Sequence, residues 1–295
     1  MKNLTSRRET LKRIAAGTVI LGISSPIIKG VKADNSNSYD HINERIRHSA
    51  CRWCYNDIPL ETLCKEGSKF GLESIDLIGP DEWPVVKKYN MTCAMGNGAQ
   101  ISIAKGWNDT QYHDVLIKNY MEIIPIAAKE GIPNIICLSG NRNGMDDETG
   151  LKNCTEGLKK ILGTAEKYKV NIVMELLNSK VDHADYQCDH TVWGVELCNR
   201  IGSERFKLLY DIYHMQIMEG DVIRTIRDNQ QFIAHYHTGG VPGRHEINDT
   251  QELNYPAIMK AIVETGFAGY VAQEFIPTRE DKLASLKEAL KICTV

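Results

Sequence analysis

The sequence predicts a single domain that folds as a (β/α)8 barrel, the parallel α/β architecture called the TIM barrel, and three observations support this prediction. From residue 45 onward, short apolar runs typical of strands alternate with amphipathic stretches typical of helices. Eight such pairs can be counted, and no linker divides them. A doubly wound open sheet is the alternative, but no GxGxxG motif follows the first strand. Eight alternating units therefore favour closure of a parallel sheet into a barrel.

The expected elements follow one another regularly along the chain. We expect strands at 46–51, 73–78, 91–95, 134–139, 171–176, 206–211, 232–237 and 269–275. We expect helices at 59–70, 82–89, 111–130, 149–168, 190–202, 219–229, 255–266 and 280–292. Three of these helices end beside a glycine, namely Gly131, Gly202 and Gly266, which is a common stop signal.

The first 33 residues have the composition of an export signal. A basic segment containing Arg7 and Arg8 precedes an apolar run and a small-residue end at Ala33, as in secretory signal peptides. The paired arginines resemble twin-arginine signals, whereas the apolar run is shorter than the ~20 residues of a membrane span. We therefore expect a cleaved twin-arginine signal peptide at 1–33, a polar linker at 34–44 and the barrel at 45–295 of a periplasmic protein with no stable membrane anchor.

The charge of the chain argues against nucleic acid as a partner. Without the first 33 residues the chain keeps 28 basic and 37 acidic residues, a net charge near −9. A body this acidic repels the phosphate backbone that dominates nucleic-acid affinity. The predicted partner is therefore a small-molecule substrate, and assembly into a homo-oligomer is left open.

The nine cysteines do not indicate a disulfide framework, because their number is odd and several lie in apolar runs. Cys51 and Cys54 have the CxxC spacing of redox and zinc sites, but no second CxxC accompanies them. A packing role is the favoured interpretation, and a disulfide between these two residues is left open.

Four successive strand candidates end with a side chain that can bind a metal ion: Glu175, Asp211, His237 and Glu274. In a barrel these strand ends meet at one rim, where catalytic groups are found. A charge at the end of an apolar run is costly unless it is paired or binds a metal. Three carboxylates and one imidazole suit one divalent ion such as Mn²⁺, Mg²⁺ or Co²⁺. Four unrelated hydrogen-bonded side chains are the alternative.

Further polar residues are expected near this quartet. His214 follows Asp211 by three residues, and Arg244 and His245 lie in the loop after the seventh strand, where they are candidates to bind substrate oxygens. A supporting role behind the site is nearly as plausible for His214. Asn178 is expected to line the pocket, and we expect His235 on the opposite strand face from His237, in packing or support.

Three segments make the sequence resemble the hydroxypyruvate isomerase family. They are YDIYHMQIMEGD at 210–221, VPGRHE at 241–246 and ELNYP at 252–256, beside the strand ends MELLN and QEF. This family belongs to the xylose isomerase-like TIM barrels, which also include sugar 3-epimerases and a DNA-repair endonuclease branch. The resemblance runs from about residue 45 to residue 280.

The resemblance implies a role for each matching position. It implies metal ligands at Glu175, Asp211 and Glu274, with His237 in the strand-7 position, and substrate contacts from His214 and Arg244. Hydroxypyruvate isomerases commonly have glutamine where this chain has His237, which is the choice of the epimerases, and they usually lack an export signal. The substrate therefore stays open between these branches.

The residue types match the chemistry that the resemblance implies. Moving a carbonyl, or inverting a carbon beside one, requires removal of a C–H proton, and two carboxylates can remove and return it. A metal ion stabilises the enediolate that forms. We predict a metal-dependent isomerase of a small hydroxy-carbonyl compound or sugar, with Glu175 and Glu274 as catalytic pair; a sugar 3-epimerase is the alternative. An endonuclease-type phosphodiesterase or a non-catalytic sugar-binding barrel fits the charge and the complete quartet less well.

Overall fold

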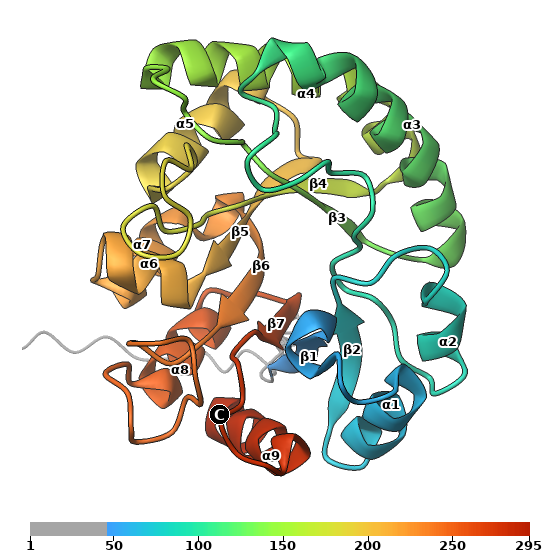
Figure 1. Cartoon of the computed structure of the whole chain (residues 1–295), viewed down its shortest axis with the longest axis vertical. Coiled ribbons are helices and arrows are strands. Elements are labelled where there is room, and N and C mark those ends of the chain that lie inside the picture. Colours follow the sequence, from blue (N-terminus) through green and yellow to red (C-terminus); the bar gives the residue numbers. More distant parts are fainter. Residues whose placement is uncertain (1–45) are drawn as a thin grey trace, which may run out of the picture. The chain divides into compact units, whose positions relative to one another are not determined.

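The protein is described by a computed structural model at residues 46–295, which belong to one compact unit. Its sheet has seven parallel strands in the order β2-β1-β7-β6-β5-β4-β3. The strands are β1 (Arg47–Cys51), β2 (Leu72–Asp76), β3 (Asn134–Cys137), β4 (Asn171–Glu175), β5 (Phe206–Asp211), β6 (Ile233–Thr238) and β7 (Tyr270–Gln273). The sheet curls, so that β1 and β7 pair side by side although they come from opposite ends of the described chain (Figure 1). The fold is TIM-barrel-like, as predicted.

The segment around Gly96 connects the two edges of this sheet. Gly96 forms one bridge to Ile78, just after β2, and another to Ile135 in β3. A Cβ atom at Gly96 would lie 2.7 Å from Cδ1 of Ile135 and 3.1 Å from Cζ2 of Trp83, so the side chains packed around this segment leave little room for a larger residue. The segment thus stands at the place in the barrel where the sequence predicts the third strand.

This segment is nevertheless not a regular strand, which corrects the prediction for 91–95. Side chains replace part of its ladder: the backbone N–H of Ala94 donates to Oγ of Ser74, and Nδ2 of Asn134 donates to the Ala94 carbonyl, both at 2.8 Å. In a regular parallel strand these two groups would bond to neighbouring backbone. The other predicted strands overlap the observed ones.

Helices surround the sheet (Figure 1). They are α1 (Leu60–Ser68), α2 (Trp83–Lys87), α3 (His113–Glu130), α4 (Asp147–Tyr168), α5 (Thr191–Ile201), α6 (Ile212–Met218), α7 (Val222–Asn229), α8 (Tyr255–Glu264) and α9 (Lys282–Cys293). The sequence missed α6 and extended α7 too far toward the N-terminus. Asp211 starts α6, because its Oδ1 accepts the backbone N–H groups of Tyr213 at 2.8 Å and His214 at 3.2 Å.

The remaining expectations on domain organisation concern the N-terminus. The predicted signal peptide at 1–33 and linker at 34–44 lie outside the described residues. Between residues 46 and 295 no helix has both the length and the apolar character needed to cross a membrane.

Candidate active site and metal centre

The four predicted ligands lie together at one end of four neighbouring strands. Glu175 and Asp211 are the last residues of β4 and β5, His237 is in β6, and Glu274 directly follows β7. Their ligand atoms all lie within 4.8 Å of one another, and all four residues are buried. Strands far apart in sequence therefore assemble the quartet, as the barrel predicts.

Charged contacts hold the quartet together. Nδ1 of His237 lies 2.6 Å from Oε2 of Glu274 and 3.3 Å from Oε1 of Glu175. Nη2 of Arg244 donates to Oδ2 of Asp211 at 2.8 Å and to Oε2 of Glu274 at 2.6 Å. Two carboxylates thus share one guanidinium group.

Two carboxyl groups of the quartet differ in their electrostatics. Burial raises the pKa of Asp211 to about 7, against the opposing effect of Arg244 and with a further contribution from Glu274. Although burial opposes it, His237 and Arg244 hold the pKa of Glu274 well below its usual range. Although burial lowers it, the neighbouring Cys51, Glu274 and Asp76 together raise the pKa of His237 well above its ordinary value. His237 and Arg244 therefore favour the charged form of Glu274, whereas burial disfavours that of Asp211.

This donor set fits a divalent cation. Carboxylate oxygens are preferred ligands of hard ions such as Mg²⁺ and Mn²⁺, and imidazole is accepted by Mn²⁺ and Co²⁺. Ligand atoms within 4.8 Å of one another can share one ion at the ordinary bond lengths of about 2.0–2.6 Å. The residues present thus suit the metal that the sequence predicts.

Arg244 reaches the quartet from the loop that follows β6. Its backbone takes a left-handed conformation with φ of 58°, and its N–H donates to the Gly240 carbonyl at 2.8 Å. Its own carbonyl accepts the N–H of Ile276 at 2.7 Å, which joins the loop to the segment after β7. Nη1 lies 2.7 Å from Nε2 of His214. The structure thus places Arg244 beside the quartet.

His214 and Asn178 also lie beside the quartet. Nδ1 of the fully buried His214 lies 2.6 Å from Nδ2 of Asn178. Burial and the nearby Arg244 lower the pKa of His214 well below its ordinary value, so this imidazole is neutral. His183, which carries no signal in the sequence, packs edge-on against His214, with ring centroids 5.3 Å apart. These side chains form a polar wall beside the carboxylates.

His245 does not reach the quartet, unlike its neighbour Arg244. Its side chain is exposed, and Nδ1 lies 3.0 Å from the carbonyl oxygen of Ile276. The described residues include no ion pair or hydrogen bond from His245 to any of the four ligands. The loop after β6 directs the side chain of Arg244 toward the quartet and that of His245 away from it. The substrate contact predicted for His245 is therefore not supported by its position.

The next residue of the loop, Glu246, is buried and bonds the loop to the segment after β7. Its carboxylate accepts the N–H and the hydroxyl of Thr278, both at 2.9 Å, and the hydroxyl of Ser285 at 2.9 Å. These bonds fix the loop that carries Arg244.

Two residues near the quartet were missed from sequence. Nε1 of Trp53, in the 3-10 turn Arg52–Tyr55 after β1, donates to Oε1 of Glu274 at 2.6 Å. Asp76 is fully buried at the end of β2. Asp76 carries the same signal as Glu175, an acid that ends an apolar run. Trp53 lies between Cys51 and Cys54, and its residue type alone does not indicate a contact with Glu274.

The structure also corrects the expected orientation of His235. His235 and His237 lie on the same face of β6, with ring centroids 5.2 Å apart, and both contact Asp76. Residues two apart on a strand share a face, so the expectation of opposite faces is wrong. The supporting role expected for His235 agrees with its position.

The cysteines behave as the composition suggests. All nine are buried and free of disulfides, including Cys51 and Cys54. Burial raises the pKa of the Cys51 and Cys54 thiols well above the ordinary value, as expected for packing residues rather than reactive ones.

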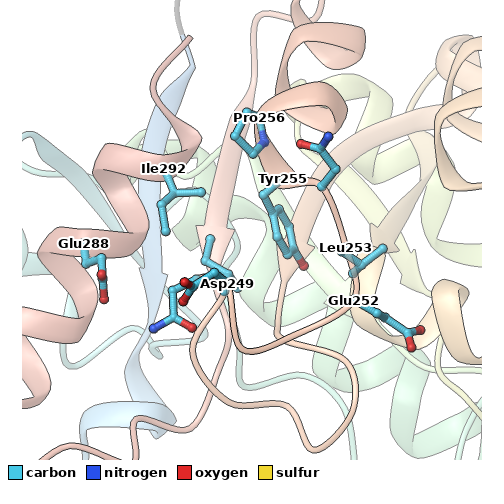
Figure 2. A pocket seen from close by; sticks show the side chains of 10 residues that line it. Asp249, Glu252, Leu253, Tyr255, Pro256, Glu288 and Ile292 are labelled. Carbon is cyan, nitrogen blue, oxygen red and sulfur yellow. The ribbon is translucent and has the colours of Figure 1, made fainter.

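A separate pocket of about 580 Å³ lies beside the start of α8 and beside Glu288 and Ile292 of α9 (Figure 2). Asp249, Glu252, Tyr255 and Glu288 are among its lining residues, and no member of the quartet lines it. This pocket is therefore distinct from the candidate active site.

The family of the chain is decided by its match to a known sequence family. The family described as xylose isomerase-like TIM barrel matches residues 85–293, which is more than half of the chain. The chain belongs to this family. The predicted resemblance is confirmed at this level, and the matched range includes all four residues of the quartet.

Curated relatives of this xylose isomerase-like chain carry isomerase names. A 2-oxo-tetronate isomerase of Cupriavidus necator is 32% identical over 122 residues, 41% of this chain and 46% of that protein. One of Pectobacterium atrosepticum is 24% identical over 76% of this chain and 88% of its own length. The hydroxypyruvate isomerase of Escherichia coli is 32% identical over 38% of this chain and 45% of its own length. The matches to the first and third thus span less than half of those proteins.

Solved structures share the xylose isomerase-like fold at low identity. A family 2 AP endonuclease of Brucella melitensis superposes with a TM-score of 0.70 and 21% identity, over 82% of this chain and 96% of that one. A 3-keto-D-glucoside 4-epimerase of Escherichia coli gives 0.69 and 16%, over 83% and 98%. The IOLI protein, solved with a zinc atom, gives 0.67 and 15%, over 84% and 95%. At these identities the likeness supports the fold alone.

Proposed function

We propose that this protein is a metal-dependent isomerase of a small hydroxy-carbonyl compound or sugar, of the hydroxypyruvate isomerase type. The observation that carries the proposal is the buried cluster in which Glu175 and Glu274 lie within 4.8 Å of Asp211 and His237. The names of the relatives, hydroxypyruvate isomerase and 2-oxo-tetronate isomerase, support the same reaction class.

The two glutamates carry the proton transfer in this proposal. One removes the proton from the carbon beside the substrate carbonyl, and the other returns a proton to the neighbouring carbon, as paired acid–base groups do. A divalent cation at the quartet (Mn²⁺, Mg²⁺ or Co²⁺) supplies electrostatic stabilisation of negative charge on the substrate oxygens. Asp211 and His237 serve mainly to hold that cation.

The polar wall orients the substrate. Arg244 offers N–H donors on a planar fork, which suits pairs of substrate oxygens. Nδ1 of the neutral His214 faces Asn178 and Nε2 faces Arg244, so a substrate hydroxyl would bond His214 by taking the place of Arg244 at Nε2. Asn178 contacts His214 and fixes its ring. We include His245 only as an outer contact, because its side chain is exposed.

A sugar 3-epimerase is the second candidate. His237 favours it, because the imidazole at this position is the choice of the epimerase branch. Both candidates use the same two glutamates, and they differ in whether the proton returns to the neighbouring carbon or to the opposite face of the same carbon.

We also propose that the protein is exported by its twin-arginine signal and acts on a small molecule, without a nucleic-acid partner or a stable membrane anchor. The basic segment with Arg7 and Arg8 and the acidic remainder of the chain support this. A fusion of residues 1–40 to a folded reporter should be exported, and replacing both arginines with lysine should retain it in the cytoplasm. Export of the double variant by the same route would contradict the proposal.

Turnover of a substrate panel tests the activity. The full chain is freed of metal with a chelator, reloaded with Mn²⁺, Mg²⁺ or Co²⁺, and assayed on 3-hydroxy-2-oxo acids, ketoses and keto-glycosides. We expect metal-dependent interconversion of at least one hydroxy-carbonyl compound. Cleavage of abasic DNA instead would favour the endonuclease branch, and saturable sugar binding without turnover would favour a binding protein.

A further inference from the structure

The barrel interior beneath the quartet is apolar on one side. Residues two positions apart on a strand share a face, so Val173 and Leu209 lie one layer below Glu175 and Asp211. Together with Met95 and Ile136 they form a small buried hydrophobic cluster. Apolar side chains of this kind are the usual filling of a TIM-barrel interior.

The side that runs from β2 through β1 and β7 to β6 is filled differently on β1, β2 and β6. Here the interior positions hold Ser49, Ser74, Asp76 and His235, and each of these residues has an exposed fraction of 0%. Burying a charged group costs several kcal/mol unless its partners compensate, and an apolar filling would avoid this cost. We therefore expect the charged cluster in this layer to have a function that an apolar filling could not provide.

The contacts of Asp76 hold its carboxylate in one orientation. Oδ1 accepts the hydroxyl of Ser49 at 2.6 Å and that of Ser74 at 3.3 Å. Oδ2 lies 2.5 Å from Nε2 of His235. Partners on three strands thus prevent the side chain from rotating.

The same carboxylate faces the imidazole of the quartet. Oδ2 of Asp76 lies 3.6 Å from Nε2 of His237, and Sγ of Cys51 lies 3.6 Å from that nitrogen. The other ring nitrogen, Nδ1, faces Glu175 and Glu274. An imidazole that binds a metal through one nitrogen carries its proton on the other, and a carboxylate beside that second nitrogen fixes ring and tautomer.

We propose that Asp76 is a positioning residue. Held by Ser49, Ser74 and His235, its carboxylate keeps the proton of His237 on Nε2, so that Nδ1 faces the cation. This inference rests on the proposed metal site and adds a residue that touches neither cation nor substrate. It explains why the side of the barrel interior next to His237 holds a buried carboxylate with its polar partners at the level where Val173 and Leu209 lie on the other side.

A second metal ion is the competing interpretation of the same residues. Cys51, Asp76 and His237 also lie within 4.8 Å of one another. Both oxygens of Asp76 are, however, already bonded by serine and histidine side chains. The geometry thus favours Asp76 as a support for the quartet over Asp76 as a ligand.

Metal affinity measured without substrate tests the inference. The metal-free full chain and its Asp76→Asn variant are titrated with Mn²⁺, and free Mn²⁺ is followed by electron paramagnetic resonance. We expect one ion per chain in both proteins, with affinity about 10–100-fold weaker in the variant, as for losses of groups that orient a ligand. Circular dichroism and thermal unfolding verify that the variant folds.

A matched control is Asp189→Asn. Asp189 is also buried, and its carboxylate also bonds a serine, Ser179 at 2.6 Å, and a histidine, His190 at 2.7 Å, with Arg142 at 3.4 Å; none of these partners is a member of the quartet. We expect the Mn²⁺ affinity of this variant to stay within about twofold of wild type, because substitutions that share no partners with the quartet usually act independently of it. If Asp76→Asn does not fold, Ser49→Ala removes one bond to Oδ1 and should weaken Mn²⁺ binding about 2–5-fold.

Two results would overturn the inference. One is a folded Asp76→Asn variant with wild-type Mn²⁺ affinity. The other is a wild type that binds two ions and a variant that binds one, because Asp76 would then be a ligand. A wild type that binds Mn²⁺ as expected but converts no substrate refutes the proposed activity alone, and a wild type that binds no divalent cation refutes both.

Discussion

The two halves of the barrel differ in the side chains at the carboxyl ends of their strands. The half made of β4 to β7 ends in Glu175, Asp211, His237 and Glu274. The half made of β1 to β3 ends in Cys51, Asp76, Gly96 and Cys137. The first half brings its ligand atoms to one point, whereas the second half mainly supplies neutral side chains that pack.

This difference indicates that the candidate catalytic and metal-binding residues lie on one half of the barrel rim. The β1–β3 half contributes through single side chains that reach the quartet, such as Trp53, which donates to Glu274, and Asp76, which faces His237. We therefore expect substitutions in the β4–β7 half to affect turnover strongly and comparable substitutions in the other half to affect it weakly.

The largest effect is expected from Glu274→Gln. The change keeps size and shape, but it removes a group that exchanges protons, which typically costs about 10²–10⁴-fold in rate. Steady-state kinetics should show this loss in kcat, with metal content measured in parallel because Glu274 is also a proposed ligand. Glu252→Gln, the same change at an exposed glutamate, should leave turnover unchanged; equal loss in both variants would contradict a special role for the β4–β7 rim.

A smaller effect is expected from Arg244→Lys. Lysine keeps the charge but loses the planar fork that contacts Asp211, Glu274 and His214. A hydrogen bond to a charged group contributes about 1.5–3 kcal/mol, so the loss of one such bond to the substrate should raise KM about 10–100-fold. His245→Ala is the neighbouring control, and its kinetics should match wild type because the side chain is exposed. A larger rise of KM in His245→Ala than in Arg244→Lys would show that His245, and not Arg244, is the residue of this loop that binds the substrate.

The loop that carries Arg244 should also show a pH-dependent stability. Burial alone would raise the pKa of Glu246, but hydrogen bonds from backbone N–H groups, Ser285 and Thr278 lower it from 4.5 to about 2. A carboxyl group with a depressed folded pKa stabilises the fold fully above pH 4.5 and loses this contribution as the pH falls toward 2.

Urea unfolding of wild type and Glu246→Gln measures this contribution. We expect the variant to be about 1–3 kcal/mol less stable at pH 7, since charged hydrogen bonds are replaced by neutral ones. The difference should shrink below pH 4.5 as Glu246 of the wild type becomes protonated. A difference that stays constant from pH 7 to pH 3 would show that the charge of Glu246 is not what holds the loop.

The smallest effect on turnover is expected in the β1–β3 half, from Trp53→Phe. Phenylalanine keeps an aromatic ring but removes the N–H that donates to Glu274 at 2.6 Å. One hydrogen bond at a partly exposed site contributes about 0.5–1.5 kcal/mol, so kcat should fall about 2–10-fold. A loss as large as that of Glu274→Gln would remove the contrast between the two halves.

The sequence predicted the quartet because the strand ends could be located. An acid or histidine that ends an apolar run is conspicuous, and eight consecutive units define where those ends meet. Asp76 carries the same signal but was missed, because it belongs to the half of the barrel that lacks the other ligands.

Other features could not be predicted because they depend on tertiary contacts. The irregularity around Ala94 arises from the side chains of Ser74 and Asn134, which lie 20 and 40 residues away in sequence. The opposite directions of Arg244 and His245 follow from a left-handed turn that the residue types do not specify. Helix α6 starts because Asp211 caps it, which periodicity alone does not reveal.

Isotope transfer tests the central claim, that Glu175 and Glu274 move the substrate proton, most directly. The reaction is run in deuterated water with the Mn²⁺-loaded full chain and the substrate that the panel identifies, and the product is analysed by NMR and mass spectrometry. We predict solvent deuterium on the product carbon that receives the proton, because a carboxylic acid exchanges its proton with water. Product that forms at the normal rate with no solvent deuterium would mean that the substrate's own hydrogen is carried across, and the two-glutamate mechanism would be wrong.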